Sequence, residues 1–256
     1  LEKTAPLALA PDGVFVFSSF PGRVPSGPAQ IHIQTQLMNC DSNSANATVR
    51  CEIISPTGQV ISSVHKDSAV AGVATGQIEQ TTQVPAPELW SPESPKLYRL
   101  VTTVEVAGKT VDRKETEFGI RTTTFDPDQG FLLNGKPYVL KGTCNHQDMA
   151  GIGAAFLDVM QYFRVAKLKE FGCNAYRTSH NAPTPELLEA CDHLGMIVMD
   201  ENRLLGSDAQ NMARWNGQIL RDRNHASVCI WSIANEEFSV QDTPQAANIA
   251  RTMQDS

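Results

Sequence analysis

The period of the hydrophobic pattern changes near Phe125, and this change constrains the fold more than any other feature of the chain. Before it, apolar and polar residues alternate, as in QIHIQTQL, TVRCEII and YRLVTTVEV, which predicts half-buried antiparallel strands. After it, short apolar runs alternate with helical segments, which predicts parallel strands buried on both faces. The chain is therefore expected to contain two domains of different class.

The first domain, residues 1–123, is predicted to be a β-sandwich of immunoglobulin-like type, with a barrel as the competing architecture. The turn signals SPTG, PDG and VAGK separate its strands, and no amphipathic helical pattern intervenes. The alternation in QIHIQTQL puts four residues on one face, namely Ile31, Ile33, Thr35 and Leu37. The same reasoning in TVRCEII selects Val49, Cys51 and Ile53.

The second domain, residues 125–256, is predicted to be a series of four βα units. The runs PYVLKG, CNAYRT, MIVMD and VCIWS are the expected strands. Parallel units of this kind wind either into an open sheet or into an eight-fold barrel, and the pattern alone leaves both open.

The expected helices carry start and stop signals. TPELLEACDHLG begins with Thr184 as N-cap and Pro185 at the first helical position, and it stops at Gly195. TPQAANIARTMQD repeats the Thr-Pro opening. FLDVMQYFRVAKLKEFG is expected to bury one apolar face made of Phe156, Val159, Met160, Phe163 and Ala166.

Composition excludes several partner classes. The 256 residues carry a net charge of −7 with no basic run, so nucleic acid is not an expected partner. No apolar run approaches the roughly 20 residues that span a bilayer, so no membrane is expected either. The six cysteines form no CxxC pair, which predicts buried thiols, although Cys40 and Cys51 flank a loop that a disulfide could close.

Polar and titratable residues follow each of the four predicted strands. In a parallel α/β domain the reactive groups gather at the carboxyl ends of the strands. The four clusters are CNHQD (Asn145, His146, Asp148), RTSHN (Arg177, Ser179, His180, Asn181), DEN (Asp200, Glu201, Asn202) and NEE (Asn235, Glu236, Glu237). Four strands ending this way predict a functional site at one edge of the sheet.

Each cluster also has a purely structural interpretation. Glu201 or Glu237 taken alone is as well explained by a helix cap or a solvated loop, and His180 and Arg177 by structural hydrogen bonds and ion pairs. A metallohydrolase would also use histidines at strand ends, but no HxH or HxxE spacing occurs. Amides and carboxylates outnumber the histidines and are suited to sugar hydroxyls.

Two long segments carry a family resemblance. NAYRTSHNAPTPELLEACDHLGMIVMDE and RDRNHASVCIWSIANEE resemble the signature segments of family-2 glycoside hydrolases, which include β-galactosidases, β-glucuronidases and β-mannosidases. LWSPESPKLYRL and EFGIRT are similar to the end of the family's immunoglobulin-like domain, and FLLNGKPYVLKGTCNHQD to its barrel entry. The resemblance implies an immunoglobulin-like β-sandwich followed by the N-terminal half of a TIM (β/α)8 barrel. Asn181 and Ala182 depart from the Tyr-Pro that often follows the motif histidine.

The resemblance also implies residue roles. A retaining glycosidase uses one carboxylic acid to protonate the leaving oxygen and a second carboxylate, about 5 Å away, as nucleophile. The acid/base position corresponds to Glu236, the 2-hydroxyl ligand to Asn235, and the arginine beside the nucleophile to Arg177. The substrate-binding positions implied are His180, Asn145, His146 and Asp200. Glu237 matches no catalytic position.

The family nucleophile belongs to the seventh barrel strand, and the pattern here ends after four. The chain is therefore expected to be a central fragment of a larger hydrolase, inactive alone, whose parent is a homo-oligomer acting on β-linked glycosides. An exo-acting β-galactosidase is favoured over a β-glucuronidase because of the RTSHN variant, and a non-catalytic module that binds carbohydrate or a partner is the alternative from another class. No cofactor is evident, Mg²⁺ or Na⁺ stays open as in some relatives, and the compartment stays open between bacterial cytoplasm and periplasm.

Overall fold

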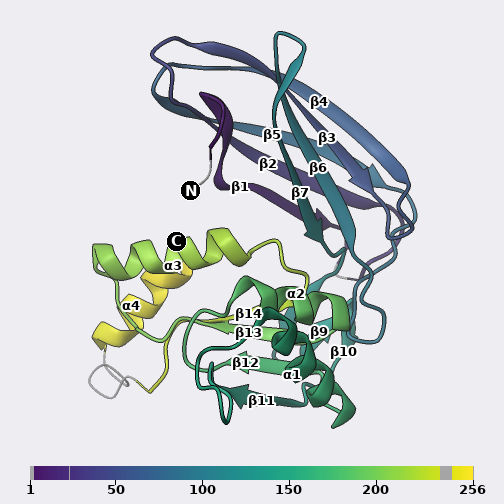
Figure 1. Ribbon diagram of the computed structural model, residues 1–256. Coiled ribbons are helices and arrows are strands. Elements are labelled where there is room, and N and C mark those ends of the chain that lie inside the picture. The colour runs from purple at the N-terminus through teal and green to yellow at the C-terminus, as the bar shows by residue number, and fades with distance from the viewer. Residues whose placement is uncertain (1–2, 23, 237–243, 256) are drawn as a thin grey trace. The chain divides into compact units, whose positions relative to one another are not determined.

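The computed structural model describes residues 3–22, 24–236 and 244–255. It divides into two compact units (Figure 1). The first comprises Leu1–Ser91 with Lys96–Tyr138, and the second comprises Pro92–Pro95 with Val139–Ser256. In the described part of the chain, no helix is long and apolar enough to cross a membrane.

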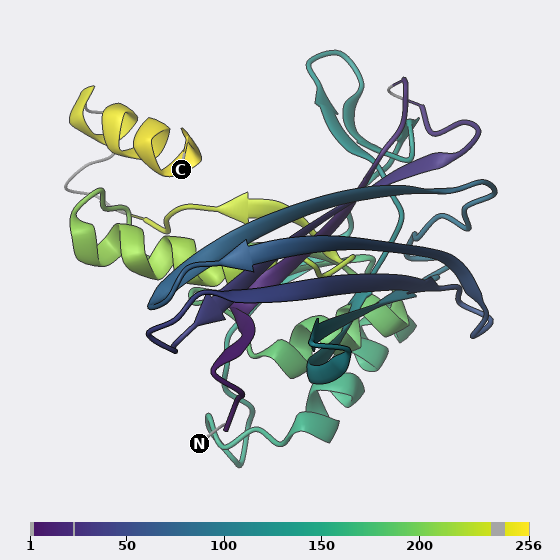
Figure 2. The same cartoon turned by 90° about the horizontal axis from the view of Figure 1, so that it is seen from above.

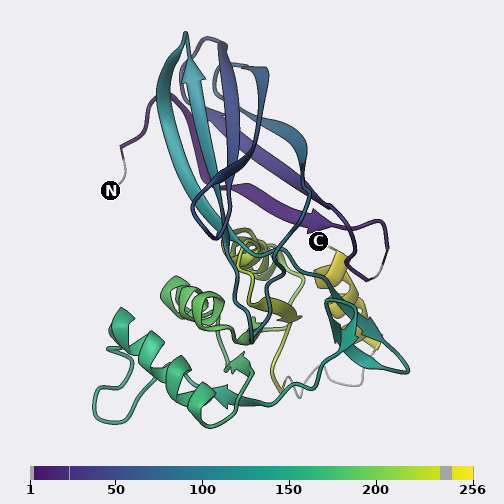
Figure 3. The ribbon, with the colours of Figure 1, turned by 90° about the vertical axis from the view of Figure 1, so that its right-hand side faces the viewer.

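The first unit is a sandwich of two antiparallel sheets, as predicted. One sheet has the order β1-β2-β5, with β1 at Leu7–Ser19, β2 at Ala29–Asn39 and β5 at Ala74–Val84. The other has the order β4-β3-β6-β7, with β3 at Ala45–Ile54, β4 at Val60–Val70, β6 at Tyr98–Val106 and β7 at Lys109–Phe118. Figures 2 and 3 show these long strands from two further directions.

The sandwich core consists of the residues that alternation selects. Ile31, Ile33, Thr35 and Leu37 on β2 are at most 1% exposed, and Val49, Cys51 and Ile53 on β3 are equally buried. Burial of each large aliphatic side chain stabilises the folded state by about 1.5–3 kcal/mol. Cys40 and Cys51 are both free thiols, so the disulfide left open by the sequence does not form.

A small antiparallel sheet lies between the sandwich strands and the parallel strands in sequence. It has the order β10-β9-β8, with β8 at Thr123–Asp126, β9 at Gly130–Leu133 and β10 at Lys136–Pro137. Asn134 and Gly135 form its tight turn with φ of 53° and 74°, conformations that Asn-Gly turns favour. The compact units consequently divide after Tyr138, whereas the predicted domains meet at residues 123–125. Of the run PYVLKG, predicted to be the first parallel strand, Pro137 belongs to β10 and only Gly142 belongs to the parallel strand, which lies over Gly142–Asn145.

The second unit contains a parallel sheet of order β11-β12-β13-β14. Its strands are β11 at Gly142–Asn145, β12 at Ala175–Thr178, β13 at Ile197–Glu201 and β14 at Val228–Ser232. Its helices are α1 at Asp158–Glu170, α2 at Pro185–Leu194, α3 at Ala209–Asp222 and α4 at Pro244–Asp255. Because the spatial order of the strands follows the sequence without reversal, the unit is part of a barrel and not an open doubly wound sheet.

The termini of α2 agree with the sequence, whereas the predicted face of α1 does not; Thr243, the threonine of the second Thr-Pro opening, lies outside the described residues. The Thr184 side chain accepts a hydrogen bond from the Leu187 N–H, and Gly195 ends α2 in the left-handed region. On α1 the predicted apolar face is wrong, because Val159 is 70% and Phe163 is 53% exposed. Gln161 and Val165 are buried instead. Apolar residues surround most of α1, so periodicity cannot tell which side meets the sheet.

Candidate active site

Strand alternation decides which side chains reach the site. On β13, Asp200 and Glu201 are neighbours, so their side chains leave opposite faces of the sheet. Glu201 lies on the same face as Arg177 of β12, and the two form an ion pair. The candidate active site is built on this face.

Glu201 is the centre of a hydrogen-bond cluster, and its side chain is 0% exposed. One carboxylate oxygen, Oε2, accepts from Arg177 Nε at 2.7 Å and from Ser232 Oγ at 2.9 Å. The other, Oε1, lies 2.7 Å from His180 Nδ1. A buried carboxylate requires such partners, and these three come from β12, β14 and the loop after β12. Glu201 therefore holds the ends of neighbouring strands in one arrangement.

Arg177 extends the cluster toward the predicted acid. Its Nη2 donates to Asn235 Oδ1 at 2.8 Å, and its Nη1 lies 3.5 Å from Cys144 Sγ on β11. The hydrogen bond with Glu201 raises the pKa of the Arg177 guanidinium, so this group stays cationic throughout the working range of pH. Because Asn235 Oδ1 accepts from Arg177, the amide nitrogen is the group that Asn235 can offer to a sugar hydroxyl.

Glu236 follows Asn235 directly and is exposed. Its φ of 45° lies in the left-handed region, which costs a non-glycine residue on the order of 1–3 kcal/mol and is concentrated at functional sites. The structure therefore brings Arg177, His180 and Asn235 into one connected cluster that adjoins Glu236. Glu237, predicted to be a loop acid, lies outside the described residues.

His146 and Asn145 lie at the border of the cluster. The His146 ring meets the His180 ring edge-on, with centroids 4.9 Å apart. The Asn145 side chain turns back to its own strand, where its amide nitrogen donates to the Thr143 carbonyl at 2.9 Å. His146 is thus in a position to meet a ligand beside His180, whereas Asn145 is engaged with β11.

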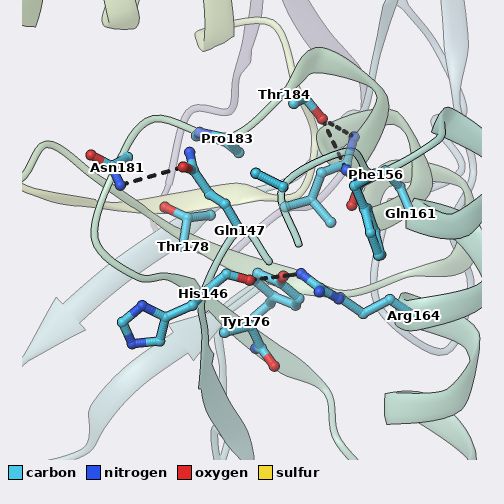
Figure 4. Close-up of a pocket in the computed structure, with 13 residues that line it drawn as sticks. His146, Gln147, Phe156, Gln161, Arg164, Tyr176, Thr178, Asn181, Pro183 and Thr184 are labelled. Atoms are coloured by element: carbon cyan, nitrogen blue, oxygen red, sulfur yellow. Dashed lines mark hydrogen bonds between the residues drawn. The ribbon is translucent and has the colours of Figure 1, made fainter. Parts of the chain in front are cut away.

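A pocket of about 190 Å³ opens behind these two residues (Figure 4). It lies between the loop after β11, helix α1 and the start of α2, and its lining includes Phe156, Gln161 and Thr184. Arg164 closes one side by donating to the carbonyls of His146 and Asp148. The pocket is lined by His146, whose ring contacts His180, but not by Arg177, Glu201 or Asn235.

Asp200, expected from the resemblance to be a substrate-binding position, has a side chain that is buried against α3 and is not exposed to a ligand. It is 0% exposed, and its carboxyl accepts a hydrogen bond from Gln218 of α3 at 2.7 Å. Its neighbour is the equally buried carboxyl of Asp222, which Arg221 contacts at 2.6 Å. Burial, followed by the proximity of Asp222, raises the pKa of Asp200 to about 8. At neutral pH the Asp200 carboxyl is therefore mainly protonated.

This pair makes stability depend on pH. The folded state binds the Asp200 proton more tightly than the unfolded chain, in which the pKa of this carboxyl is near 3.8. The stabilisation of the folded state by this proton is therefore full below pH 3.8 and is lost as the pH rises through about 8. We expect Asp200→Asn, which retains a donor toward Asp222, to remove this loss. Melting temperatures of both proteins at pH 6 and pH 9 test it. An equal drop in both proteins would show that Asp200 is not the titrating group.

A metal ion does not fit the cluster. Among the described residues, no group of three or more His, Cys, Asp or Glu side chains could hold one. Both oxygens of Glu201 already accept from Arg177, His180 and Ser232. No step of the chemistry below is therefore assigned to a metal.

The sequence places Glu201 in one of the four strand-end clusters but gives it no catalytic or binding role, and it does not select Ser232. Glu201 was weighed as a cap or loop residue because an acid at a strand end has several ordinary explanations. The signal that could have found Glu201 is strand alternation. Glu201 is two residues after Met199, which pairs with Arg177 across the sheet, so Glu201 and Arg177 point to the same face. That register makes Glu201 face the site and Asp200 face α3.

Comparison with known proteins identifies the family. The description "Glycosyl hydrolases family 2" matches residues 21–121, and "Glycosyl hydrolases family 2, TIM barrel domain" matches residues 127–217 and 207–256. The chain belongs to glycosyl hydrolase family 2. Both family domains are present, and the sandwich followed by a partial barrel agrees with the fold described above.

Relatives of known name are β-galactosidases and β-glucuronidases. A β-galactosidase of Bacteroides ovatus is 37% identical over 249 residues, covering 92% of this chain and 29% of the relative. A β-glucuronidase of Bacteroides fragilis is 29% identical over 225 residues, covering 81% of this chain and 32% of the relative. The crystal structure of a family-2 member from Bacteroides cellulosilyticus superposes with a TM-score of 0.90 at 31% identity, covering 98% of this chain and 34% of that one. The chain thus spans about a third or less of each.

Proposed function

We propose that the protein containing this chain is a retaining exo-glycoside hydrolase that cleaves terminal β-galactosides, with Glu236 as the acid/base. The observation that carries the proposal is the continuous contact from Glu201 through Arg177 to Asn235, which fixes the residue directly before Glu236. An exposed carboxyl beside a rigid amide and a fixed guanidinium is suited to a glycosidic oxygen and the adjacent 2-hydroxyl.

In the proposed reaction, Glu236 donates its proton to the glycosidic oxygen as the bond to the anomeric carbon breaks. The carboxylate so formed then takes a proton from the water that releases the sugar. Asn235 Nδ2 donates to the 2-hydroxyl, a contact that strengthens as charge develops on the ring. Arg177 supplies a fixed positive charge that favours the ionised form of a nearby nucleophilic carboxylate.

We propose that the nucleophile lies outside these 256 residues. Glu201 is a poor candidate because it is fully buried and both of its oxygens are already bound to Arg177, His180 and Ser232. A nucleophilic carboxylate must instead reach the anomeric carbon about 5 Å from the acid. The chain alone would then protonate a substrate without completing a double displacement, and it would be inactive.

A β-galactosidase is favoured over a β-glucuronidase by the RTSHN segment alone, since relatives of both names are about equally identical: 37% for the β-galactosidase of Bacteroides ovatus and 36% for a protein of Formosa agariphila named "Putative beta-glucuronidase". The β-glucuronidase activity is the second candidate because both names occur among the relatives. A carbohydrate-binding module without catalysis is the third. We further propose that the whole protein assembles as a homo-oligomer.

A panel of nitrophenyl β-glycosides on the full-length protein tests these assignments. We expect release of nitrophenol from the β-galactoside at least tenfold faster than from the β-glucuronide, and retention of the β-anomer in the first-formed product. The matched control is residues 1–256 expressed alone, for which we expect no turnover. Faster β-glucuronide cleavage would select the second candidate, and no cleavage of any substrate by the full-length protein would select the binding module.

A further inference from the structure

The two sheets of the sandwich have chemically different outer faces. On the β4-β3-β6-β7 sheet the outward side chains are charged and paired: Arg50 with Glu105, and both Arg99 and Arg113 with Glu115. Such interspersed charges are typical of a face exposed to water.

The outer face of the β1-β2-β5 sheet carries few charged side chains, and Lys66 of β4 reaches its border, where it donates to the Glu79 carbonyl at 3.3 Å. Strand alternation and register place on it an amide-rich set of side chains, of which Glu79 is the one carboxylate: Gln30, Gln34 and Gln36 on β2, and Gln77, Glu79, Thr81 and Gln83 on β5. Gln83 donates to Gln30 across the strands at 3.2 Å. This face, the amide face, offers paired donors and acceptors over two strands.

An aromatic ridge borders the amide face. Phe15 and Phe17 of β1 stack with centroids 4.9 Å apart, and Phe17 stacks on His32 of β2 at 4.7 Å. Ser19 Oγ lies 2.8 Å from His32 Nε2 and fixes that ring. The Phe17 side chain is 37% exposed, so the ridge presents apolar surface beside the amides.

We propose that the amide face and its aromatic ridge bind a neutral β-linked glycan chain, separately from the catalytic cluster. A neutral sugar has an apolar C–H face, which the ridge can cover, and rows of hydroxyls, each of which pairs with an amide that both donates and accepts. Charged side chains would gain nothing from such a ligand and would lose hydration, which agrees with their scarcity on this face.

A protein partner fits this face less well. If a protein surface covered this row of glutamines, every amide donor and acceptor would need a hydrogen-bond partner on that surface. Each buried group left without a partner costs about 1–3 kcal/mol. Protein interfaces concentrate apolar and aromatic residues at their centres, whereas the ridge here lies at the edge strand of the sheet. A glycan can remain partly hydrated while it lies across the amides.

Native affinity electrophoresis of the full-length protein tests the proposal. The gels contain soluble β-1,4-galactan or hydroxyethyl cellulose as neutral polymers, and polygalacturonate as the charged comparison. All proteins carry Glu236→Gln so that the polymer is not degraded. The choice of galactan rests on the proposed function, whereas hydroxyethyl cellulose tests the surface independently of it.

We expect at least one neutral polymer to retard the protein, and Phe17→Ala and Gln34→Ala each to weaken retardation about tenfold. Phe171→Ala, which removes an 86% exposed ring elsewhere, and Arg113→Ala on the opposite sheet are the matched controls and should be retarded like the parent. Phe17→Ala in the active protein should leave hydrolysis of nitrophenyl galactoside unchanged, so failure of this site and failure of the proposed activity are distinguishable.

Four results would overturn the proposal, three of them from the gels. One is the absence of retardation by both neutral polymers, another is retardation by polygalacturonate alone, and the third is equal weakening by Phe17→Ala and Phe171→Ala. A change in solution mass caused by Phe17→Ala would also overturn it, because the ridge would then be a contact between protein surfaces.

Discussion

Glu236→Gln in the full-length protein is expected to lower kcat/KM for a glycoside with a poor leaving group, such as methyl β-galactoside, by about 10²–10⁴-fold. The loss for dinitrophenyl β-galactoside in the glycosylation step should be far smaller, since dinitrophenolate departs without a proton. The selectivity follows from the reaction: only an alkoxide leaving group needs Glu236 as an acid. Steady-state kinetics on the two substrates provide the measurement.

Two controls accompany this prediction. Glu170→Gln removes an exposed acid that pairs with Lys167 on α1, and it should leave both rates unchanged. Azide added to the Glu236→Gln protein should restore turnover of the activated substrate, because azide attacks the glycosyl intermediate without a general base. Equal losses on both substrates would assign the acid role to another residue.

The sandwich was predictable because its burial pattern is strictly local. Each strand such as β2 turns alternate side chains toward the core, so Ile31, Ile33 and Leu37 are selected by parity alone. Helix α2 was predictable for a similar reason, since Thr184 and Gly195 act on the backbone within one turn.

Features that depend on tertiary contacts were not predictable. Helix α1 has apolar residues on most sides, and only its packing against the second unit's core decides that Val165 is buried and Phe163 is exposed. The same limit applies to PYVLKG, whose apolar run is compatible with a parallel strand. The Asn134–Gly135 turn pairs Pro137 with Leu132 of β9, and the parallel pairing with β12 begins only at Gly142, the last residue of the run.

At the site, residue types were predictable and their directions were not. The resemblance selected Arg177, His180 and Asn235, which the structure connects by hydrogen bonds through Glu201. It also selected Asp200, one residue from Glu201, which faces α3 because side-chain direction reverses at every residue of a strand. A motif identifies a neighbourhood, and register decides which of two adjacent acids lies on the same face of the sheet as Arg177.

Glu201→Gln is expected to lower kcat/KM by about 10²-fold on poor and activated substrates alike, the size of loss that a displacement near 1 Å produces. Arg177 Nε and His180 Nδ1 approach different oxygens of Glu201, at 2.7 Å each. In the glutamine variant one of those oxygens becomes an amide nitrogen. If that nitrogen faces Arg177, two donors oppose each other and the guanidinium must move; if it faces His180, Nδ1 must become an acceptor and the ring proton must shift to Nε2. Either Arg177 loses its alignment toward Asn235, or Nε2 of His180 changes from an acceptor to a donor toward the proposed substrate.

The kinetic signature separates this positioning role from the acid role. Because Glu201 acts through both residues, its loss should raise KM and lower kcat without regard to the leaving group, in contrast to Glu236→Gln. Ser232→Ala removes one hydrogen bond to the same carboxylate while leaving the two main contacts, so a loss below about tenfold is expected from it. The guanidinium side chain of Arg177 is 30% exposed, so water can solvate it in the variant and the melting temperature should fall by only a few degrees, roughly the effect of 1–2 kcal/mol. If the Glu201→Gln protein is unfolded, Glu201→Asp takes its place in the test, because aspartate keeps the charge on a shorter side chain. A folded variant that loses activity only on substrates with poor leaving groups would instead identify Glu201 as the acid.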